Sequence, residues 1–330
     1  MALAVASLLL MCVAHAAAQD SCLDNLTACG TKFQQLLVDE DKFWFGNVFA
    51  TTCPTVPAFG ETTSPRCQNP DPTRKSILSR ILKTDDAALL QQVSQTVSLA
   101  TLAFTAPATD FYACGHDFTY PAIKNYYIDP LKVITLDQAQ VDYRPSFTWN
   151  AAPGTLYTVI VIDVGYYFSH GIYINAAPGS PDQWEAVDKY HGSRNGQPKA
   201  MPYLFMAIPQ TSRLDLATAT GVFNSIKFAN NFQLNVPSFL QQLGFAGDAT
   251  QRMSASLMSM YGDTFGATKS QEFTSANWCP YFVSAQPVLK KALAQVGWLF
   301  SEYNSTLVMN DPLYENDLNM FALYAHKESF

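Results

Sequence analysis

Charged residues are scarce in this chain, and cations are scarcer than anions. Its 330 residues include 20 Lys and Arg against 27 Asp and Glu, which gives a formal net charge of −7. A nucleic-acid-binding protein needs an excess of cations to neutralise phosphates, so this composition excludes nucleic acid as a partner. With 48% hydrophobic and 13% aromatic residues, the chain instead has enough apolar surface to build a folded core.

The sequence also lacks the short motifs that mark the commonest enzymes and nucleotide-binding proteins. It contains no GxSxG, GxGxxG, GxxxxGK[ST] or HExxH pattern, which excludes the corresponding hydrolase, dinucleotide, P-loop and zincin sites. Histidine is rare, since after the first eighteen residues only His116, His170, His191 and His326 occur. A site that depends on an imidazole group therefore has few candidates.

The N-terminal segment, residues 1–18, has the features of a secretory signal peptide. It contains no Lys, Arg, Asp or Glu, and its apolar run from Leu3 to Ala14 is followed by small residues. This pattern predicts cleavage near Ala16 or Ala18 and a secreted, extracellular protein, while a short membrane anchor is the alternative. No later stretch reaches the roughly 18 apolar residues that span a bilayer, so we expect no stable membrane insertion.

Six cysteines remain after the signal peptide, and an even number in an oxidising compartment predicts three disulfide bonds of undetermined pairing. They are Cys22, Cys29, Cys53, Cys67, Cys114 and Cys279. The close spacing of a thiolate metal site is absent, so we expect no metal at these residues. Two sequons, at Asn25 and Asn304, predict N-glycosylation and agree with secretion.

Composition divides the rest of the chain into three parts. Residues 19–118 combine the cysteine cluster with a helical pattern that follows Asp85. Residues 119–255 alternate β-branched and aromatic runs with Pro, Gly and Asn, which predicts a β domain. Residues 256–330 include a predicted helix from Pro287, so we expect a helical C-terminal extension. The expected fold class is α+β, mostly β with flanking helices.

Four strands are predicted within the β domain. Leu156–Val164 is a nearly unbroken apolar run, as expected of a strand that is buried on both faces. The other predicted strands are Pro145–Trp149, Gly171–Asn175 and Tyr203–Ile208. A polar loop is predicted at Asp188–Lys199, and a short helix is predicted from Pro237.

Asp163 and His170 have the clearest chemical interest. Asp163 ends the apolar strand, where an ionised carboxylate is costly unless it is paired or opens into a cleft. His170 stands before the next strand, so a tight antiparallel turn would bring both side chains to the same end of the sheet. There the carboxylate could orient the imidazole and form a small polar site. In the alternative, Asp163 only caps a turn and His170 is an ordinary half-buried ring.

Two enzyme-like alternatives use the same residues. Asp163, His170 and Ser193 have the residue types of a hydrolase triad, but Ser193 lies in a polar loop without a nucleophile elbow. Asp163, His170 and His191 could ligate a metal, but their spacing is not that of a helical ligand pair. The sequence therefore predicts a protein that is not an enzyme and has no cofactor.

A series of short segments in this region has a familiar order and spacing. They are Pro130–Val133, Pro145–Trp149, Tyr157–Asp163, His170 with Ile172–Asn175, Tyr190–Ser193, Tyr203–Gln210 and Phe223–Phe228. Together they resemble the phosphatidylethanolamine-binding protein family, also called the Raf kinase inhibitor protein family. The resemblance implies a β-sandwich core with a small cleft that receives anions such as phosphate head groups.

The resemblance also implies which residues form the cleft. By position they are Asp163, His170, Tyr190, Gly192, Ser193 and Tyr203. Two family motifs are altered, because Val164–Tyr166 replaces Pro-Asp-x-Pro and Met201-Pro202 replaces His-Arg. Each charge-assisted donor that is lost costs ~1.5–3 kcal/mol, so phosphate binding should be much weaker than in the family. Arg194, in the loop, is the residue that could compensate.

We therefore expect a secreted protein that binds a small lipid-like or anionic ligand around Asp163 and His170. The altered motifs favour a pocket that is more apolar than the family's. Its expected lining is Tyr166, Phe168, Met201 and Tyr203. The alternative is an extracellular structural, interaction or protease-inhibitor-like protein, which would bind another protein and keep only a vestigial cleft.

Overall fold

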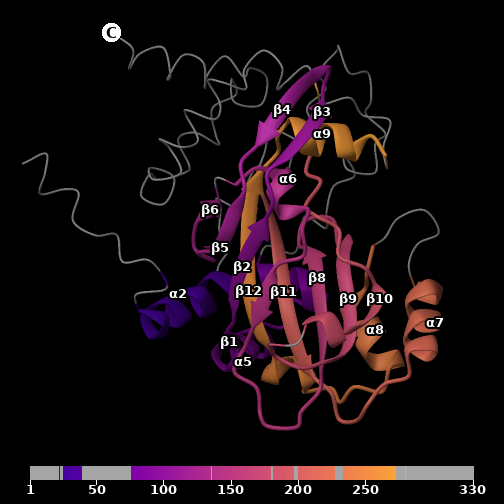
Figure 1. Ribbon diagram of the computed structural model, residues 1–330. Coiled ribbons are helices and arrows are strands. Elements are labelled where there is room, and N and C mark those ends of the chain that lie inside the picture. The colour runs from indigo at the N-terminus through magenta and orange to yellow at the C-terminus, as the bar shows by residue number, and fades with distance from the viewer. Residues whose placement is uncertain are drawn as a thin grey trace, which may run out of the picture.

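The computed structural model describes residues 22, 25–38, 76–134, 136–179, 181–196, 200–226, 233–272 and 279 (Figure 1). This part is a mixture of helices and strands, as expected, and it contains three β-sheets. Its helices are α2 (Leu26–Val38), α4 (Ile77–Leu82), α5 (Ala87–Thr96), α6 (Gln138–Val141), α7 (Leu216–Ile226), α8 (Val236–Gln242) and α9 (Thr264–Ser270). Two 3₁₀ turns add η2 (Pro181–Gln183) and η3 (Ala249–Arg252).

The main sheet has the strand order β1-β12-β11-β8-β9-β10, and β6 also pairs with β12. Its strands are β1 (Ser98–Leu99), β6 (Val133–Ile134), β8 (Tyr157–Asp163), β9 (Ser169–Ala176), β10 (Glu185–Asp188), β11 (Ala200–Pro209) and β12 (Ser254–Tyr261). The central strands β12, β11, β8 and β9 are antiparallel to one another in that order, whereas β1 and β6 pair with β12 in parallel. Every residue of β8 is buried, which confirms the prediction from its apolar run.

A smaller sheet packs on the main sheet through aromatic side chains. It consists of β5 (Ile123–Tyr127), β2 (Thr101–Ala106) and β7 (Ser146–Thr148), in that order. The Phe147 ring of β7 lies 5.9 Å from the Phe205 ring of β11, measured between centroids. Trp149, just beyond β7, lies 5.2 Å from Tyr157 of β8. These rings bury a large apolar area, so the interface between the two sheets is a main source of stability.

A hairpin of β3 (Thr109–Ala113) and β4 (His116–Tyr120) extends beyond the sheets and packs beside α9 (Figure 1). Its turn residues Cys114 and Gly115 both have positive φ, 51° and 84°, as the tightest hairpin turns require. Phe111 of β3 contacts Phe265 of α9 with ring centroids 4.5 Å apart. The hairpin therefore adds its own small aromatic cluster beside α9.

Two disulfide bonds occur in the described part of the chain. Cys22 is bonded to Cys29, and Cys114 is bonded to Cys279, each pair with Cα atoms 5.0 Å apart. The second bond joins the tip of the hairpin to a residue beyond α9. The remaining predicted partners, Cys53 and Cys67, lie outside the described residues, as do the predicted signal peptide, the helix from Pro287 and the sequon at Asn304.

The sheets extend beyond the part of the sequence that was expected to be the β domain. The division at residue 255 falls inside β12, which pairs along its length with β11. The division at residue 118 falls inside β4, and the segment before it supplies β1 and β2. β12 was not predicted from the sequence, because it contains no β-branched residues. All of its residues are nevertheless buried. No helix in the described ranges has the length and apolar content to cross a membrane.

The two predicted helices that can be checked are present. α5 begins after Asp86, whose carboxylate accepts hydrogen bonds from the N–H groups of Ala88 and Leu89. The N-cap is therefore Asp86, one residue later than Asp85, after which the sequence pattern placed the helix. α8 begins after Asn235, with Pro237 in its first turn, where a missing N–H group costs nothing.

Candidate functional site

Asp163 ends β8 and closes the turn that leads into β9. Its Oδ1 atom accepts hydrogen bonds from the N–H groups of Gly165 at 2.7 Å and Tyr166 at 2.9 Å. The N–H of Tyr167 donates to the backbone carbonyl of Asp163 at 2.8 Å. The carboxylate is buried, and these amide donors offset part of the cost of burying it. Asp163 thus caps a turn, as one of the two sequence-based interpretations proposed.

His170 lies at the start of β9, at the same end of the sheet as Asp163. Its Nδ1 atom is 2.9 Å from the carbonyl oxygen of Gly192 and 3.1 Å from that of His191. Because a carbonyl oxygen only accepts, Nδ1 carries the proton and donates. The buried ring is therefore held by the loop after β10 in one orientation.

Tyr203 of β11 completes this end of the sheet. It is the register partner of Asp163 across the β8–β11 ladder, and its ring meets that of His170 edge-on with centroids 5.0 Å apart. Its hydroxyl donates to the carbonyl oxygen of Ser193 at 3.1 Å. The structure therefore places Asp163, His170 and Tyr203 at the same end of three neighbouring strands. The sequence predicted this position for Asp163 and His170, and the family resemblance implied Tyr203.

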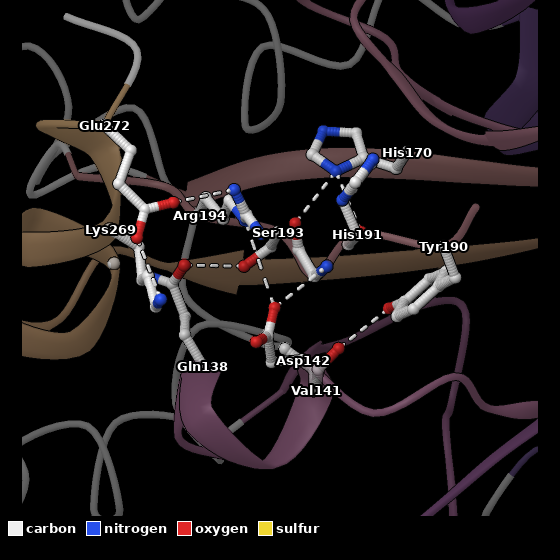
Figure 2. Close-up of polar contacts among 12 residues, drawn as sticks. Gln138, Val141, Asp142, His170, Tyr190, His191, Ser193, Arg194, Lys269 and Glu272 are labelled. Atoms are coloured by element: carbon white, nitrogen blue, oxygen red, sulfur yellow. Dashed lines mark hydrogen bonds and ion pairs between the residues drawn. The ribbon is translucent and has the colours of Figure 1, made fainter. Parts of the chain in front are cut away.

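The loop Tyr190–Asn195 lies against α6 and the residue that follows it (Figure 2). The hydroxyl of Tyr190 donates to the carbonyl oxygen of Val141 at 2.8 Å. The N–H of Gly192 donates to Oδ1 of Asp142 at 3.1 Å. The segment that precedes β7 in the sequence thus holds the loop in place from outside the sheet.

Gln138, at the start of α6, is the centre of a buried hydrogen-bond network. Its amide oxygen accepts from the Ser193 hydroxyl at 2.6 Å (Figure 2). Its amide nitrogen donates to the carbonyl oxygens of Asn195 at 2.6 Å and Tyr261 at 3.2 Å. Sequence analysis missed Gln138. The only local signal was the Asp137-x-x-Gln140 pattern, in which the Gln140 side chain accepts from the Asp137 N–H at 3.0 Å and which marks a helix start.

Arg194, the residue that could have compensated for the lost cations, lies between two carboxylates. Its Nη1 atom is 3.2 Å from Glu272, and its Nε atom is 4.0 Å from Oδ1 of Asp142. Glu272 is also paired with Lys269 at 2.9 Å (Figure 2). The positive charge that the sequence placed near the cleft is therefore balanced by the protein's own acidic groups.

The geometry lends no support to the two enzyme-like alternatives. The Ser193 hydroxyl donates to Gln138, so it lacks the hydrogen bond to a histidine base that a hydrolase nucleophile needs. His191 has its Nε2 atom 3.6 Å from Asp188. In the part of the chain that the structure describes, Asp163, His170 and His191 do not gather their ligand atoms into a metal-sized cluster.

A different group of potential ligands lies elsewhere, where Cys22, Cys29 and Asp129 have ligand atoms within 4.8 Å of one another. The two sulfur atoms are joined in a disulfide. A disulfide does not offer the thiolates that bind a metal. This group therefore gives no reason to assign a metal site.

Tyr190 in the loop and Tyr173 next to it both have a pKa above the usual 10.0 of a tyrosine. Burial raises the pKa of Tyr190 well above its usual 10.0, and the charges of Asp142 and Tyr173 raise it further. Burial also raises the pKa of Tyr173, although the Tyr190 N–H and Arg144 partly oppose this effect. At physiological pH both hydroxyls are neutral: that of Tyr190 donates to Val141, and that of Tyr173 accepts from the Tyr190 N–H at 2.8 Å.

The residues expected to line an apolar pocket contribute to the main core instead of standing apart from it. Tyr166 and Met201 are buried members of this core, and Phe168 packs against it partly buried. The rings of Tyr166 and Phe168 stack with centroids 6.2 Å apart. Most of the predicted apolar lining is therefore enclosed in the core and has little surface left to meet a ligand.

The cluster and the loop combine a carboxylate, an imidazole whose Nδ1 atom donates to the loop, and protonated phenols with one arginine that is paired with carboxylates. Such a site can orient a small molecule by hydrogen bonds and apolar contact, and it contains no activated nucleophile among the residues described above. In comparisons with known proteins, neither a protein-family model nor a curated protein matches this chain.

Proposed function

We propose that this protein is a secreted, non-enzymatic binding protein with an architecture like that of the phosphatidylethanolamine-binding protein family. It takes a small lipid-like or anionic ligand at the cluster around Asp163 and His170. The observation that carries this proposal is that Asp163, His170 and Tyr203, each more than nine-tenths buried, converge at one end of the main sheet. Burying ionisable groups together is costly, and such clusters occur preferentially at functional sites.

The arrangement of strands supports the proposed architecture. The segments that resemble the family form β7, β8, β9 and β11 in the same order. The matching loop, Tyr190–Ser193, lies next to the histidine that the resemblance assigned to the cleft. The two disulfides and the signal-like N-terminus support secretion.

The neighbourhood of His170 favours binding over catalysis. Its Nδ1–H group is held by the loop carbonyls, so the ring cannot use that nitrogen as a base. The Ser193 hydroxyl is committed to Gln138. Phe168, which packs against the core and is only partly buried, offers contact area for a ligand with hydrocarbon character.

Native mass spectrometry of the purified full-length protein tests the proposal. The wild type should carry a retained small molecule, His170→Ala should lose it, and His116→Ala should keep it, because His116 is exposed on β4. Circular dichroism should show that both variants are folded. A wild-type protein without bound mass, or a bound mass that His170→Ala does not change, would contradict the proposal.

A second candidate function is that of an extracellular structural or interaction protein with a vestigial cleft. It is favoured by the observation that the hydroxyls of Tyr190, Ser193 and Tyr203 all donate within the protein. An empty wild-type protein in the same mass measurement would support this candidate. In that case the exposed tyrosines of the hairpin and β5, Tyr112 and Tyr127, are the first side chains to test for protein contacts.

A further inference from the structure

We infer that Asp142 is a built-in anionic ligand of the loop Tyr190–Asn195, so that the native protein rejects phosphate-like anions and binds a neutral molecule. The inference deepens the proposed function, on which it rests for the identity of the site. It narrows the ligand from a lipid-like or anionic molecule to an uncharged one. The experiment that tests it measures the binding of inorganic phosphate. That measurement does not depend on whether the protein has a native ligand.

The Asp142 carboxylate occupies a position in which an external anion would be held. Its Oδ1 atom accepts the N–H of Gly192 at 3.1 Å and lies 4.0 Å from Nε of Arg194. A backbone amide and a guanidinium group that face the same oxygen form the kind of donor pair that binds phosphate. Here the oxygen belongs to the protein itself, 50 residues before the loop.

Gly192 is the residue that allows this close approach. A Cβ atom on Gly192 would lie 2.6 Å from both the Cα and the Oδ1 of Asp142. Such distances do not occur between real side chains, and both atoms belong to a short, stiff residue that cannot move away easily. The absence of a side chain at position 192 is therefore a condition for the contact with Asp142.

An anion from solvent could reach this position if the carboxylate were absent. The Asp142 side chain is 29% exposed and that of Arg194 is 16% exposed, so the contact lies at the surface of the protein. To bind there, phosphate must displace a tethered carboxylate, whose effective concentration is high. It must also compete with Glu272, which lies on the other side of Arg194 at 3.2 Å and already pairs with its guanidinium group. Both effects oppose anions and leave neutral ligands unaffected.

The test measures inorganic phosphate binding to the full-length protein by NMR, using the Gly192 amide signal. In the wild type we expect no shift of that signal up to high millimolar phosphate. Asp142→Asn keeps an acceptor of the same shape but removes the charge, and it should bind phosphate at least ~10-fold more tightly than the wild type. Arg194→Met in the Asp142→Asn background should abolish the gain.

Glu272→Gln is the matched control, because it also removes a carboxylate from Arg194 but not from the Gly192 amide. It should leave the Gly192 signal insensitive to phosphate. A phosphate-dependent shift in the wild type would overturn the inference even if Asp142→Asn does not fold. A folded Asp142→Asn protein without increased phosphate affinity would overturn it too, whereas failure to retain any native ligand would affect only the proposed function.

Discussion

Ser193 and Gln138 are 55 residues apart in the sequence, yet the serine hydroxyl donates to the glutamine amide oxygen at 2.6 Å. The same amide group reaches the carbonyl oxygens of Asn195 and Tyr261. One side chain therefore connects α6, the loop beside His170 and the end of β12. The shape of the candidate site depends on this connection as much as on the residues that the sequence pointed to.

Replacing Gln138 should destabilise the protein more than an ordinary polar substitution. Gln138→Ala leaves the Ser193 hydroxyl and two backbone carbonyls without their partner, which should lower the free energy of unfolding by about 2–4 kcal/mol. Urea denaturation measures this change. Gln242→Ala, at the exposed end of α8, is the control and should have little effect. Equal losses for both variants would show that the Gln138 network contributes nothing particular.

Two glycine-to-alanine substitutions should change stability in opposite directions. At Gly266 in α9 an added Cβ would overlap the carbonyl oxygen of Asn195 and the Gln138 amide, so Gly266→Ala should destabilise by about 1–3 kcal/mol. At Gly221 in α7 an added Cβ meets nothing within 4 Å, so Gly221→Ala should stabilise by about 0.5–1 kcal/mol through helix propensity. Thermal unfolding separates the two. If Gly266→Ala does not change the stability, α9 does not pack as closely against Asn195 and Gln138 as the structure indicates.

Several elements could be predicted because their signal is local. The apolar run of β8, the alternation in β7 and the Pro237 start of α8 each depend on neighbouring residues alone. β12 was missed because Ser256 and Ser259 interrupt its apolar residues, although both serines are buried against adjacent strands. Burial of a small polar residue depends on tertiary packing, which a single sequence does not report.

The candidate site was predictable only where it is built from the strands. Asp163 and His170 were identified because they flank one turn between successive strands, and Tyr203 was identified only through the family resemblance. Gln138 and Asp142 were not identified, because their partners lie 50 or more residues away in the sequence. The Asp137-x-x-Gln140 pattern marks a helix start in this segment, but it does not indicate that α6 packs against the loop.

The stability of the protein at alkaline pH should depend on the ionisation of the Tyr190 phenol. Its folded-state pKa is raised well above 10.0, whereas in the unfolded chain the phenol ionises near pH 10. The stability from this group is therefore fully present below pH 10 and is lost as the pH rises from there toward the folded-state pKa. The slope from one such group is up to ~1.4 kcal/mol per pH unit.

Urea denaturation between pH 9 and pH 11.5 measures this slope. Tyr190→Phe should reduce this slope by the contribution of one group, while Tyr173, whose pKa is also raised, keeps its own. The substitution should also lower stability at neutral pH by about 1 kcal/mol, because the hydrogen bond to Val141 is lost. Tyr112→Phe, at an exposed position of the hairpin, should do neither. An unchanged slope in Tyr190→Phe would contradict burial of the Tyr190 hydroxyl beside Asp142.

A crystal structure of the protein, purified together with any molecule that it retains, tests ligand binding at His170 most directly. We expect electron density for a small uncharged molecule in contact with the His170 ring and Tyr203. The Asp142 carboxylate should still accept the hydrogen bond from the Gly192 amide. A structure in which the protein's own side chains fill all the space around the His170 ring would contradict this expectation.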